Sequence, residues 1–306
     1  MAPAEFAALL ERLRPSFLQR VEDHRIPPEC AEHLAGIYLP LSAWLAAQRN
    51  KPTLVLGING AQGSGKSTLA DFLGRILEAG FGLRVAALSI DDFYLARAER
   101  ERLARQIHPL LHTRGVPGTH DVNLGLATIR ALRSAEPGTL TPLPAFDKAQ
   151  DDRRPAQEWP QFRGRPDAIL FEGWCVGTAP QPEEALALPV NALEAGEDAD
   201  GRWRRYVNER LRAEYAELFG EQDRLVMLKV PGMDSVFEWR ALQERKLAES
   251  LPPGSPHRLM DAGGIERFVM HYERLTRHIL AEMPGRADLV LHLDGNHRFT
   301  RIQLNR

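Results

Sequence analysis

One glycine-rich motif constrains the fold of this chain more than any other feature. The motif G-x-x-x-x-G-K-S spans residues 60–67, directly after an apolar run and directly before a stretch with helical spacing. Glycines let successive backbone N–H groups turn toward a bound anion, and the following helix directs its positive dipole end at the same point. In this pattern the lysine reaches the β- and γ-phosphates of a nucleotide, and the serine hydroxyl ligates Mg²⁺. The predicted phosphate-binding residues are Gly60, Ala61, Gln62, Gly63, Ser64, Gly65, Lys66, Ser67 and Thr68.

Short apolar runs alternate with helical stretches along the chain. Five runs rich in Val, Ile and Leu suit strands that are buried on both faces. The runs cover residues 54–58, 85–90, 168–171, 225–230 and 289–293, and the helical stretches cover 66–79, 123–133, 203–219, 235–250 and 265–283. Strands that alternate with helices favour a parallel sheet covered on both sides. The sequence therefore predicts an α/β chain with the P-loop NTPase fold, in which helices flank a parallel five-stranded sheet.

Three regions fall outside this alternation. Residues 1–50 are predicted to form an N-terminal helical extension, broken at two adjacent prolines, that lies against a P-loop domain of residues 51–306. Residues 136–166 hold many of the prolines and are too long for a bare connection, so we expect a functional insert there. Residues 180–201 contain no aromatic side chain and are typical of a mobile surface loop. We therefore expect one domain with an extension and an insert, rather than two domains.

Charge and cysteine content narrow the choice of partners. The chain has 39 Lys and Arg against 41 Asp and Glu, a net charge of −2, so it has no global attraction for nucleic acid or an anionic membrane. Its two cysteines, Cys30 and Cys175, stand far apart, which excludes a disulfide framework and a zinc ribbon. Charges among the first apolar residues are typical of neither a signal peptide nor a membrane span. We expect a cytoplasmic protein with a small-molecule partner and without a nucleic-acid or membrane partner.

Carboxylates follow two of the predicted strands. Asp91 and Asp92 follow the run 85–90, and Glu172 follows the run 168–171. Ligands of open α/β sheets bind at the carboxyl ends of the strands. A carboxylate at Asp91 is placed to accept the proton of an attacking hydroxyl, which a kinase needs and a nucleotide switch does not, while Asp92 suits a helix cap equally well. Glu172 suits the binding of Mg²⁺ through water, and the absence of an N-K-x-D motif favours ATP over GTP.

Several motifs in a fixed order resemble a known family. They are the phosphate loop, SIDDFYL at 89–95, RGVPGTHD at 114–121, PAFDKAQDDR at 144–153, FEGW at 171–174 and FEWRALQERKL at 237–247. Together they resemble the plant- and fungal-type D-glycerate 3-kinases, which belong with phosphoribulokinase, uridine kinase and bacterial pantothenate kinase among the P-loop kinases. The resemblance implies transfer of the γ-phosphoryl group of ATP to D-glycerate, giving 3-phosphoglycerate, with Mg²⁺ as cofactor.

The same resemblance implies roles for individual residues. Asp91 is implied to be the general base, and Lys66 to act on the migrating phosphoryl group together with a basic lid over residues 235–264. Arg240 and Lys246 are the implied cations of that lid. The implied acceptor-binding residues are Asp92, Tyr94, Arg114, His120, Asp121, Phe146, Asp147 and Lys148.

Alternatives remain open from the residues themselves. Arg114 suits a carboxylate clamp but also a surface position, and His120 suits either a substrate hydroxyl or a cap of the next helix. The family pattern has a serine where this chain has Ala149, and a glycine-rich, basic stretch where it has residues 150–154. These departures keep two rival functions in view: a kinase for a nucleoside, pantothenate or another sugar acid, and a nucleotide-dependent switch that transfers nothing.

Overall fold

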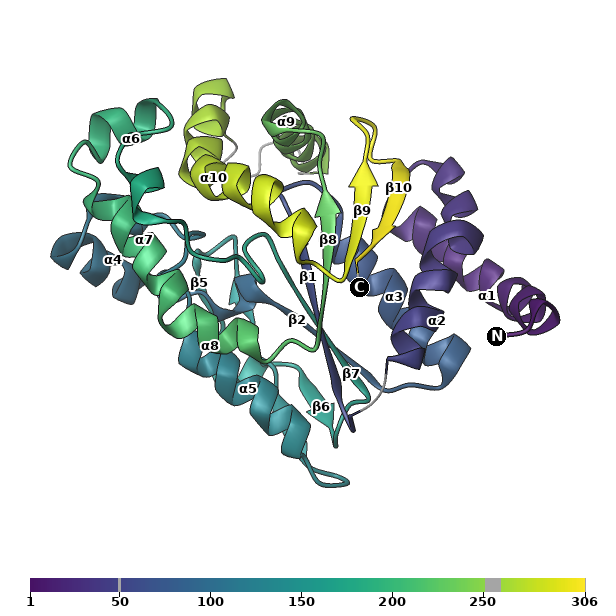
Figure 1. Ribbon diagram of the computed structural model, residues 1–306. Helices are drawn as coiled ribbons and strands as arrows, with labels where there is room; N and C mark the ends of the chain where they lie inside the picture. The colour runs from purple at the N-terminus through teal and green to yellow at the C-terminus, as the bar shows by residue number, and fades with distance from the viewer. Residues whose placement is uncertain (49–50, 251–259, 306) are drawn as a thin grey trace.

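A central sheet of mostly parallel strands organises the molecule (Figure 1). We describe it from a computed structural model, in which residues 1–48, 51–250 and 260–305 are described, with the backbone alone at 246–250. Within these residues the sheet has six strands in the order β10-β9-β8-β1-β7-β2. They are β1 (Leu54–Gly60), β2 (Val85–Ser89), β7 (Ala168–Gly173), β8 (Arg224–Lys229), β9 (Leu289–Leu293) and β10 (Phe299–Leu304).

The strand count corrects one prediction and confirms the rest of the sheet. The five predicted strands are all present and parallel. The sixth strand, β10, pairs antiparallel with β9, so the predicted five-stranded sheet was wrong by one strand. Every residue of β10 is exposed or half-buried, and its side chains include Thr300, Arg301 and Gln303. A search for continuous apolar runs finds only strands that are buried on both faces, and β10 is not one of them.

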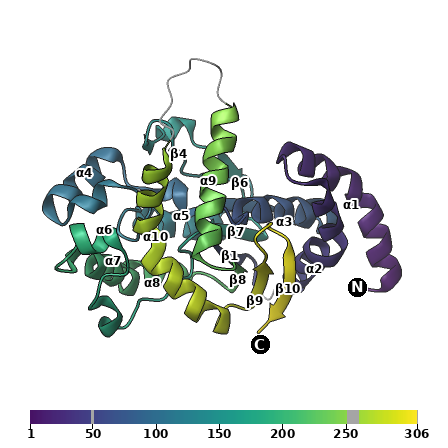
Figure 2. The same cartoon turned by 90° about the horizontal axis from the view of Figure 1, so that it is seen from above.

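Helices cover both faces of the sheet (Figures 1 and 2). Their bounds are α1 (Pro3–Asp23), α2 (Leu39–Ala47), α3 (Lys66–Phe81), α4 (Arg97–Gln106), α5 (Val122–Ser134), α6 (Ala192–Glu197), α7 (Arg202–Arg212), α8 (Glu214–Gly220), α9 (Met233–Ser250) and α10 (Ala262–Glu282). The predicted helix 203–219 is two helices, α7 and α8, because the backbone at Ala213 is not helical (φ −91°, ψ −110°).

The buried strands explain why the core forms on both sides of the sheet. Every residue of β1 is buried. Successive side chains of a strand point to opposite faces. Val55 therefore joins the core under α5, α7 and α8, whereas Leu54 and Leu56 join the core under α1, α2 and α3. The continuous apolar run that predicts β1 is the consequence of having helices on both faces.

The N-terminal helices pack against α3. Phe17 of α1 stacks on Phe72 of α3 with the ring centroids 4.5 Å apart. Arg20 of α1 donates a hydrogen bond to Asp71 of α3, with 2.6 Å between Nη2 and Oδ2. The structure thus places an apolar stack and an ion pair between the extension and the helix that carries the phosphate loop.

The region 136–166 forms two short antiparallel strand pairs. One pair joins β3 (Leu140–Pro142) to β6 (Gln161–Arg163), and the other joins β4 (Phe146–Asp147) to β5 (Asp152–Arg153).

The region 180–201 was predicted to be a surface loop, but it contains the helix α6. The buried Glu194 of α6 pairs with Arg274 of α10 at 2.6 Å. Composition does not reveal such a long-range ion pair. In the described part of the chain no helix is long and apolar enough to cross a membrane.

Candidate active site

The phosphate loop joins the carboxyl end of β1 to the first turn of α3. Gly63 and Gly65 have φ angles of +78° and +86°, which residues with a side chain rarely adopt. A Cβ atom at Gly60 would lie 2.4 Å from the Ser64 Oγ atom, so the loop closes tightly only with glycine there. Because α3 begins at Lys66, its first backbone N–H groups lack partners in the helix and are open to an anion.

The side chains of the loop and of the first turn of α3 add polar groups to this site. Gln62 Oε1 and Ser64 Oγ are buried and have no hydrogen-bond partner within the described residues. The positive charge of Lys66 lowers the pKa of Asp91, which places Lys66 near the end of β2. The loop therefore combines the Ser64 hydroxyl, which can donate a hydrogen bond, with the Lys66 cation, and both suit a phosphate.

Glu172 and Ser67 meet beside the loop. Glu172 lies at the end of β7, paired in register with Ile58 of β1 and Ser89 of β2. The Ser67 hydroxyl donates a hydrogen bond to Glu172 Oε1 at 2.8 Å. Glu172 Oε2 is buried and has no hydrogen-bond partner among the residues described. A hydroxyl and a carboxylate with an open oxygen are ligand types that Mg²⁺ prefers, so the residues present fit this ion.

Asp91 stands at the end of β2 between two donors. Its Oδ1 accepts a hydrogen bond from the Tyr94 hydroxyl at 2.9 Å, and its Oδ2 accepts one from Lys148 Nζ at 2.6 Å. Burial by itself would raise the pKa of Asp91, but the charges of Lys148 and Lys66 and both hydrogen bonds lower it to about 2. Asp91 is therefore an ionised hydrogen-bond acceptor over the whole neutral range.

The neighbouring Asp92 has the opposite electrostatic environment. Burial raises its pKa to about 6, and the negative charges of Asp91 and Glu172 act in the same direction. Its Oδ1 accepts a hydrogen bond from the Phe146 backbone N–H at 3.3 Å, which holds the insert against the end of β2. Two adjacent carboxylates thus have well-separated pKa values because only Asp91 contacts a cation.

His120 is buried beneath Tyr94. The two rings stack with their centroids 4.6 Å apart. The Tyr215 hydroxyl accepts a hydrogen bond from the Gly118 N–H at 2.9 Å and forms a second hydrogen bond with His120 Nδ1 at 2.6 Å. The other ring nitrogen of His120, Nε2, is buried and has no hydrogen-bond partner within the described chain. Burial lowers the pKa of His120 to about 4, so the ring is neutral.

Asp121 caps a helix. Its Oδ1 accepts a hydrogen bond from the Leu124 N–H at 3.0 Å at the start of α5, and its Oδ2 pairs with Arg153 at 3.2 Å. The capping role that sequence left open for His120 is therefore performed by its neighbour.

Arg114, Phe146 and Lys148 come together from two distant motifs. The Arg114 guanidinium lies over the Phe146 ring, with its carbon 5.6 Å from the centroid, and Phe146 also contacts Tyr94 edge to face at 5.2 Å. Asp147 does not join this group but accepts hydrogen bonds from the next backbone N–H groups and shapes the turn. Arg114 and Asp91 therefore flank a platform made by Tyr94 and Phe146.

Known proteins are similar to this chain in sequence and in structure. The chain is 33% identical to the uncharacterized kinase mug58 of Schizosaccharomyces pombe over 231 residues, which cover 71% of this chain and 78% of that protein. It is 29% identical to the chloroplastic D-glycerate 3-kinase of Arabidopsis thaliana, over 82% of this chain and 56% of that protein. The solved D-glycerate 3-kinase of Cryptococcus neoformans aligns with a TM-score of 0.68 and 25% identity, over 90% of this chain and 98% of that one. No family model matches the chain.

The chain belongs to the family of P-loop kinases that includes the D-glycerate 3-kinases. It is an ATP-dependent kinase with an α/β fold. The resemblance expected from the motifs is confirmed by both the sequence and the structural comparisons.

The helix α9 of this kinase lies against the phosphate loop. Trp239 of α9 stacks on His297 of the turn between β9 and β10, with 3.9 Å between the ring centroids. His297 Nε2 donates a hydrogen bond to the Gly63 carbonyl at 2.8 Å, and Trp239 Nε1 donates one to the Gly295 carbonyl at 2.9 Å. We call Trp239, His297 and Gly63 the loop clamp. Sequence analysis did not assign a role to Trp239, because an aromatic residue in a helix is more often part of the core.

The predicted lid is described only in part. Arg240 pairs with Glu244 one turn later at 2.6 Å and lies over the Phe268 ring of α10, with its guanidinium carbon 5.0 Å from the centroid. Figure 2 shows α9 and α10 side by side. The Lys246 side chain and residues 251–259 of the predicted lid lie outside the described residues.

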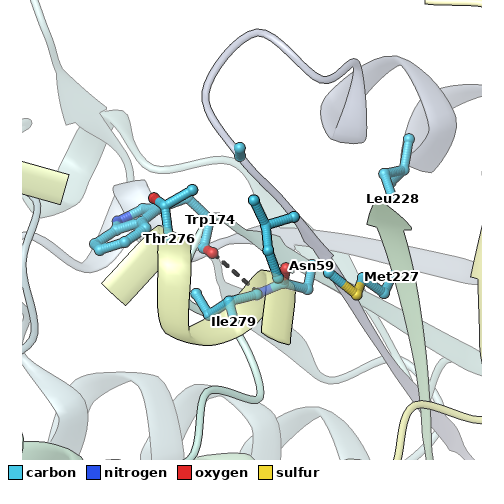
Figure 3. Close-up of a pocket in the computed structure, with 8 residues that line it drawn as sticks. Asn59, Trp174, Met227, Leu228, Thr276 and Ile279 are labelled. Carbon is cyan, nitrogen blue, oxygen red and sulfur yellow. Dashed lines mark hydrogen bonds between the residues drawn. The ribbon is translucent and has the colours of Figure 1, made fainter. Parts of the chain in front are cut away.

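Asn59 fixes Glu172 relative to the phosphate loop, and sequence analysis missed it. Its Nδ2 donates hydrogen bonds to the backbone oxygens of Trp174 (Figure 3) and Val176, each at 2.9 Å. These bonds tie the end of β1 to the segment just after Glu172. A polar residue directly after the apolar run 54–58, still within β1, was the available signal. The cavity beside it is lined by Asn59, Ala61, Trp174, Met227, Leu228, Thr276, Ile279 and Leu280.

Proposed function

We propose that this kinase transfers the γ-phosphoryl group of ATP to D-glycerate and releases 3-phosphoglycerate and ADP. The observation that carries the proposal is the pair formed by Asp91 and Arg114 on either side of the Tyr94–Phe146 platform. A hydroxy acid needs a proton acceptor for its hydroxyl and a cation for its carboxylate. The named relatives of the chain support the choice of D-glycerate.

On the donor side, Gly60 to Thr68 and the start of α3 bind the phosphates of ATP. Lys66 neutralises charge on the γ-phosphoryl group. Ser67 and Glu172 would hold Mg²⁺, since their contact leaves Glu172 Oε2 open. When bound, that ion supplies positive charge to the phosphate oxygens during transfer.

On the acceptor side, Asp91 takes the proton of the acceptor hydroxyl. The hydroxyl oxygen forms the new bond to the γ-phosphorus, while the bond between that phosphorus and the ADP oxygen breaks. Lys148 and Tyr94 keep the Asp91 carboxylate ionised and oriented before transfer. Arg114 binds the acceptor carboxylate, and the unpartnered Nε2 atom of His120 is a hydrogen-bonding group for an acceptor oxygen. Phe146 supports Arg114, and Asp92, Asp121 and Asp147 hold the surrounding backbone.

We also propose that Arg240 and Lys246 act from the lid on the phosphoryl group in transit. The proposal is supported by the position of Arg240 near the acceptor side: its charge, like that of Arg114, lowers the pKa of Tyr272, whose hydroxyl donates a hydrogen bond to the Arg114 backbone oxygen at 3.0 Å. A lid that excludes water would limit the hydrolysis of ATP. We place the kinase in the cytoplasm, with small molecules as its partners. The two free cysteines support a reducing compartment.

A panel of acceptors with labelled ATP tests the proposal. D-glycerate, L-glycerate, glycerol, uridine and pantothenate are each supplied with MgATP, and the products are separated and identified by mass spectrometry. We expect one labelled product, 3-phosphoglycerate, from D-glycerate. The other acceptors are included because residues 150–154 differ from the family pattern in the acceptor-side insert. Label on another alcohol with none on D-glycerate would assign a different acceptor, and release of phosphate that does not depend on any acceptor would contradict phosphoryl transfer.

A further inference from the structure

Asp151 joins two arginines at the acceptor side of the site. It lies in the turn between β4 and β5, where its φ angle is +58°. Its Oδ1 pairs with Arg114 Nη1, and its Oδ2 pairs with Arg100 Nη2 at 3.0 Å. The three side chains carry two positive charges and one negative charge, which leaves a net charge of +1 beside the Tyr94–Phe146 platform.

Arg100 anchors this group to the fold. It is 1% exposed, and its guanidinium donates hydrogen bonds to the backbone oxygens of Leu95, His112 and Asp151. A buried guanidinium with this many fixed partners does not move easily. Asp151 is therefore held by its backbone and its carboxylate at once, and its position is set by the core and not by the solvent-exposed turn.

Arg114 is held on one edge and open on the other. Nη1 pairs with Asp151, the guanidinium plane lies over Phe146, and the Arg114 backbone oxygen accepts a hydrogen bond from the Tyr272 hydroxyl at 3.0 Å. Within the described residues no hydrogen bond is recorded for its Nε and Nη2 atoms. These two atoms form the edge that binds a carboxylate in bidentate fashion.

We propose that Asp151 is a positioning residue for the acceptor: it fixes one edge of Arg114 so that the other edge receives the acceptor carboxylate. This inference rests on the proposed function, since it requires an acceptor with a carboxylate. Asp151 lies in the stretch where this chain departs from the family pattern, so the device belongs to this chain's own sequence.

The test measures acceptor and ATP kinetics separately. We expect Asp151→Asn to raise the KM for D-glycerate about tenfold, with kcat and the KM for ATP changed less than twofold. Asp152→Asn is the matched control, because Asp152 accepts hydrogen bonds from the N–H groups of Arg97 and Arg153 and is not recorded in contact with Arg114 in the described chain. The control variant should keep the wild-type KM for D-glycerate.

A second background tests whether Asp151 acts through Arg114. In the Arg114→Lys kinase the guanidinium edge no longer exists, so adding Asp151→Asn should change the KM for D-glycerate by less than twofold. Asp151→Glu keeps the charge that buried Arg100 requires and moves the carboxylate by one methylene group, so it gives the same KM rise even if the Asn variant folds poorly. An unchanged KM in a folded variant, or a full effect in the Arg114→Lys background, would overturn the inference alone. A wild-type kinase that is inactive on D-glycerate would overturn the proposed function and this inference with it.

Discussion

The donor half and the acceptor half of the site are built in different ways. The donor half consists of the ends of β1 and β7 and the first turn of α3, and its key residues lie within one motif or at the end of one strand. The acceptor half brings together residues from β2, the 114–121 turn and the insert through ion pairs and aromatic contacts. Regular backbone geometry therefore fixes the phosphate site, whereas side-chain contacts across long sequence separations fix the acceptor site.

Asp91 belongs to both halves, so its removal should have the largest effect. The positive charge of Lys66 in the donor half lowers the pKa of Asp91, and Lys148 in the acceptor half donates a hydrogen bond to its carboxylate. We expect Asp91→Asn to lower kcat by about 10²–10⁴-fold, since the amide cannot accept the proton of the hydroxyl. ATP binding, measured by calorimetry, should remain within a few fold of the wild-type value. An unchanged kcat would show that another group accepts the proton.

Replacing Arg114 should affect the acceptor half of the site and leave the donor half unchanged. Arg114→Lys removes the bidentate edge and should raise the KM for D-glycerate at least about tenfold, because hydrogen bonds to charged groups contribute about 1.5–3 kcal/mol. The KM for ATP should stay the same. Arg84→Lys is the matched control, since Arg84 lies over the Phe162 ring at 5.3 Å, outside the site. Equal changes in the KM values for both substrates would mean that the two halves are not independent.

Disturbing the loop clamp should affect the donor half of the site. An alanine at Gly63 would place its Cβ 2.7 Å from Trp239 Cβ, at a backbone φ of +78°. We expect Gly63→Ala to raise the KM for ATP about 5–30-fold, because left-handed backbone costs about 1–2 kcal/mol and α9 must shift. Gly82→Ala is the control: its φ is +66°, and no atom lies within 4 Å of the added Cβ. A similar KM for ATP in both variants would argue against the clamp.

The same difference between the halves explains what the sequence could predict. The positions of Gly60 to Ser67 and of Glu172 in the fold could be predicted, because a motif and a strand end specify them locally. The Arg114–Asp151 pair could not be predicted, because it depends on buried Arg100 and on a turn 37 residues away from Arg114. The strand β10 was missed for a related reason: its exposed positions carry no pattern that demands burial. Trp239 and Asn59 were missed because a helix aromatic and a single polar strand residue do not reveal partners in distant segments of the chain.

Asp92 lies where the two halves meet, and its environment gives the smallest predicted effect. Its pKa is raised to about 6 from an ordinary value of 3.8, so the folded state favours the neutral carboxyl. The stability that this group contributes is therefore present below about pH 4 and is lost as the pH rises through 6. Asp92→Asn keeps an oxygen for the Phe146 N–H group but removes the charge. Above pH 6 the variant should be more stable than the wild type by about 1 kcal/mol, a value reduced from the full shift because the side chain is partly exposed.

Urea denaturation at intervals from pH 4 to pH 8 measures this difference. The two curves of unfolding free energy against pH should converge near pH 4 and separate up to about pH 6. Asp147→Asn serves as the control with the opposite sign, because hydrogen bonds from the Gln150 and Ala149 N–H groups lower the pKa of Asp147. That carboxylate favours the folded state when ionised, so its replacement brings no gain at neutral pH. A stability difference for Asp92→Asn that does not change with pH would mean that the contact with the insert, and not the charge beside Asp91 and Glu172, determines the cost of this residue.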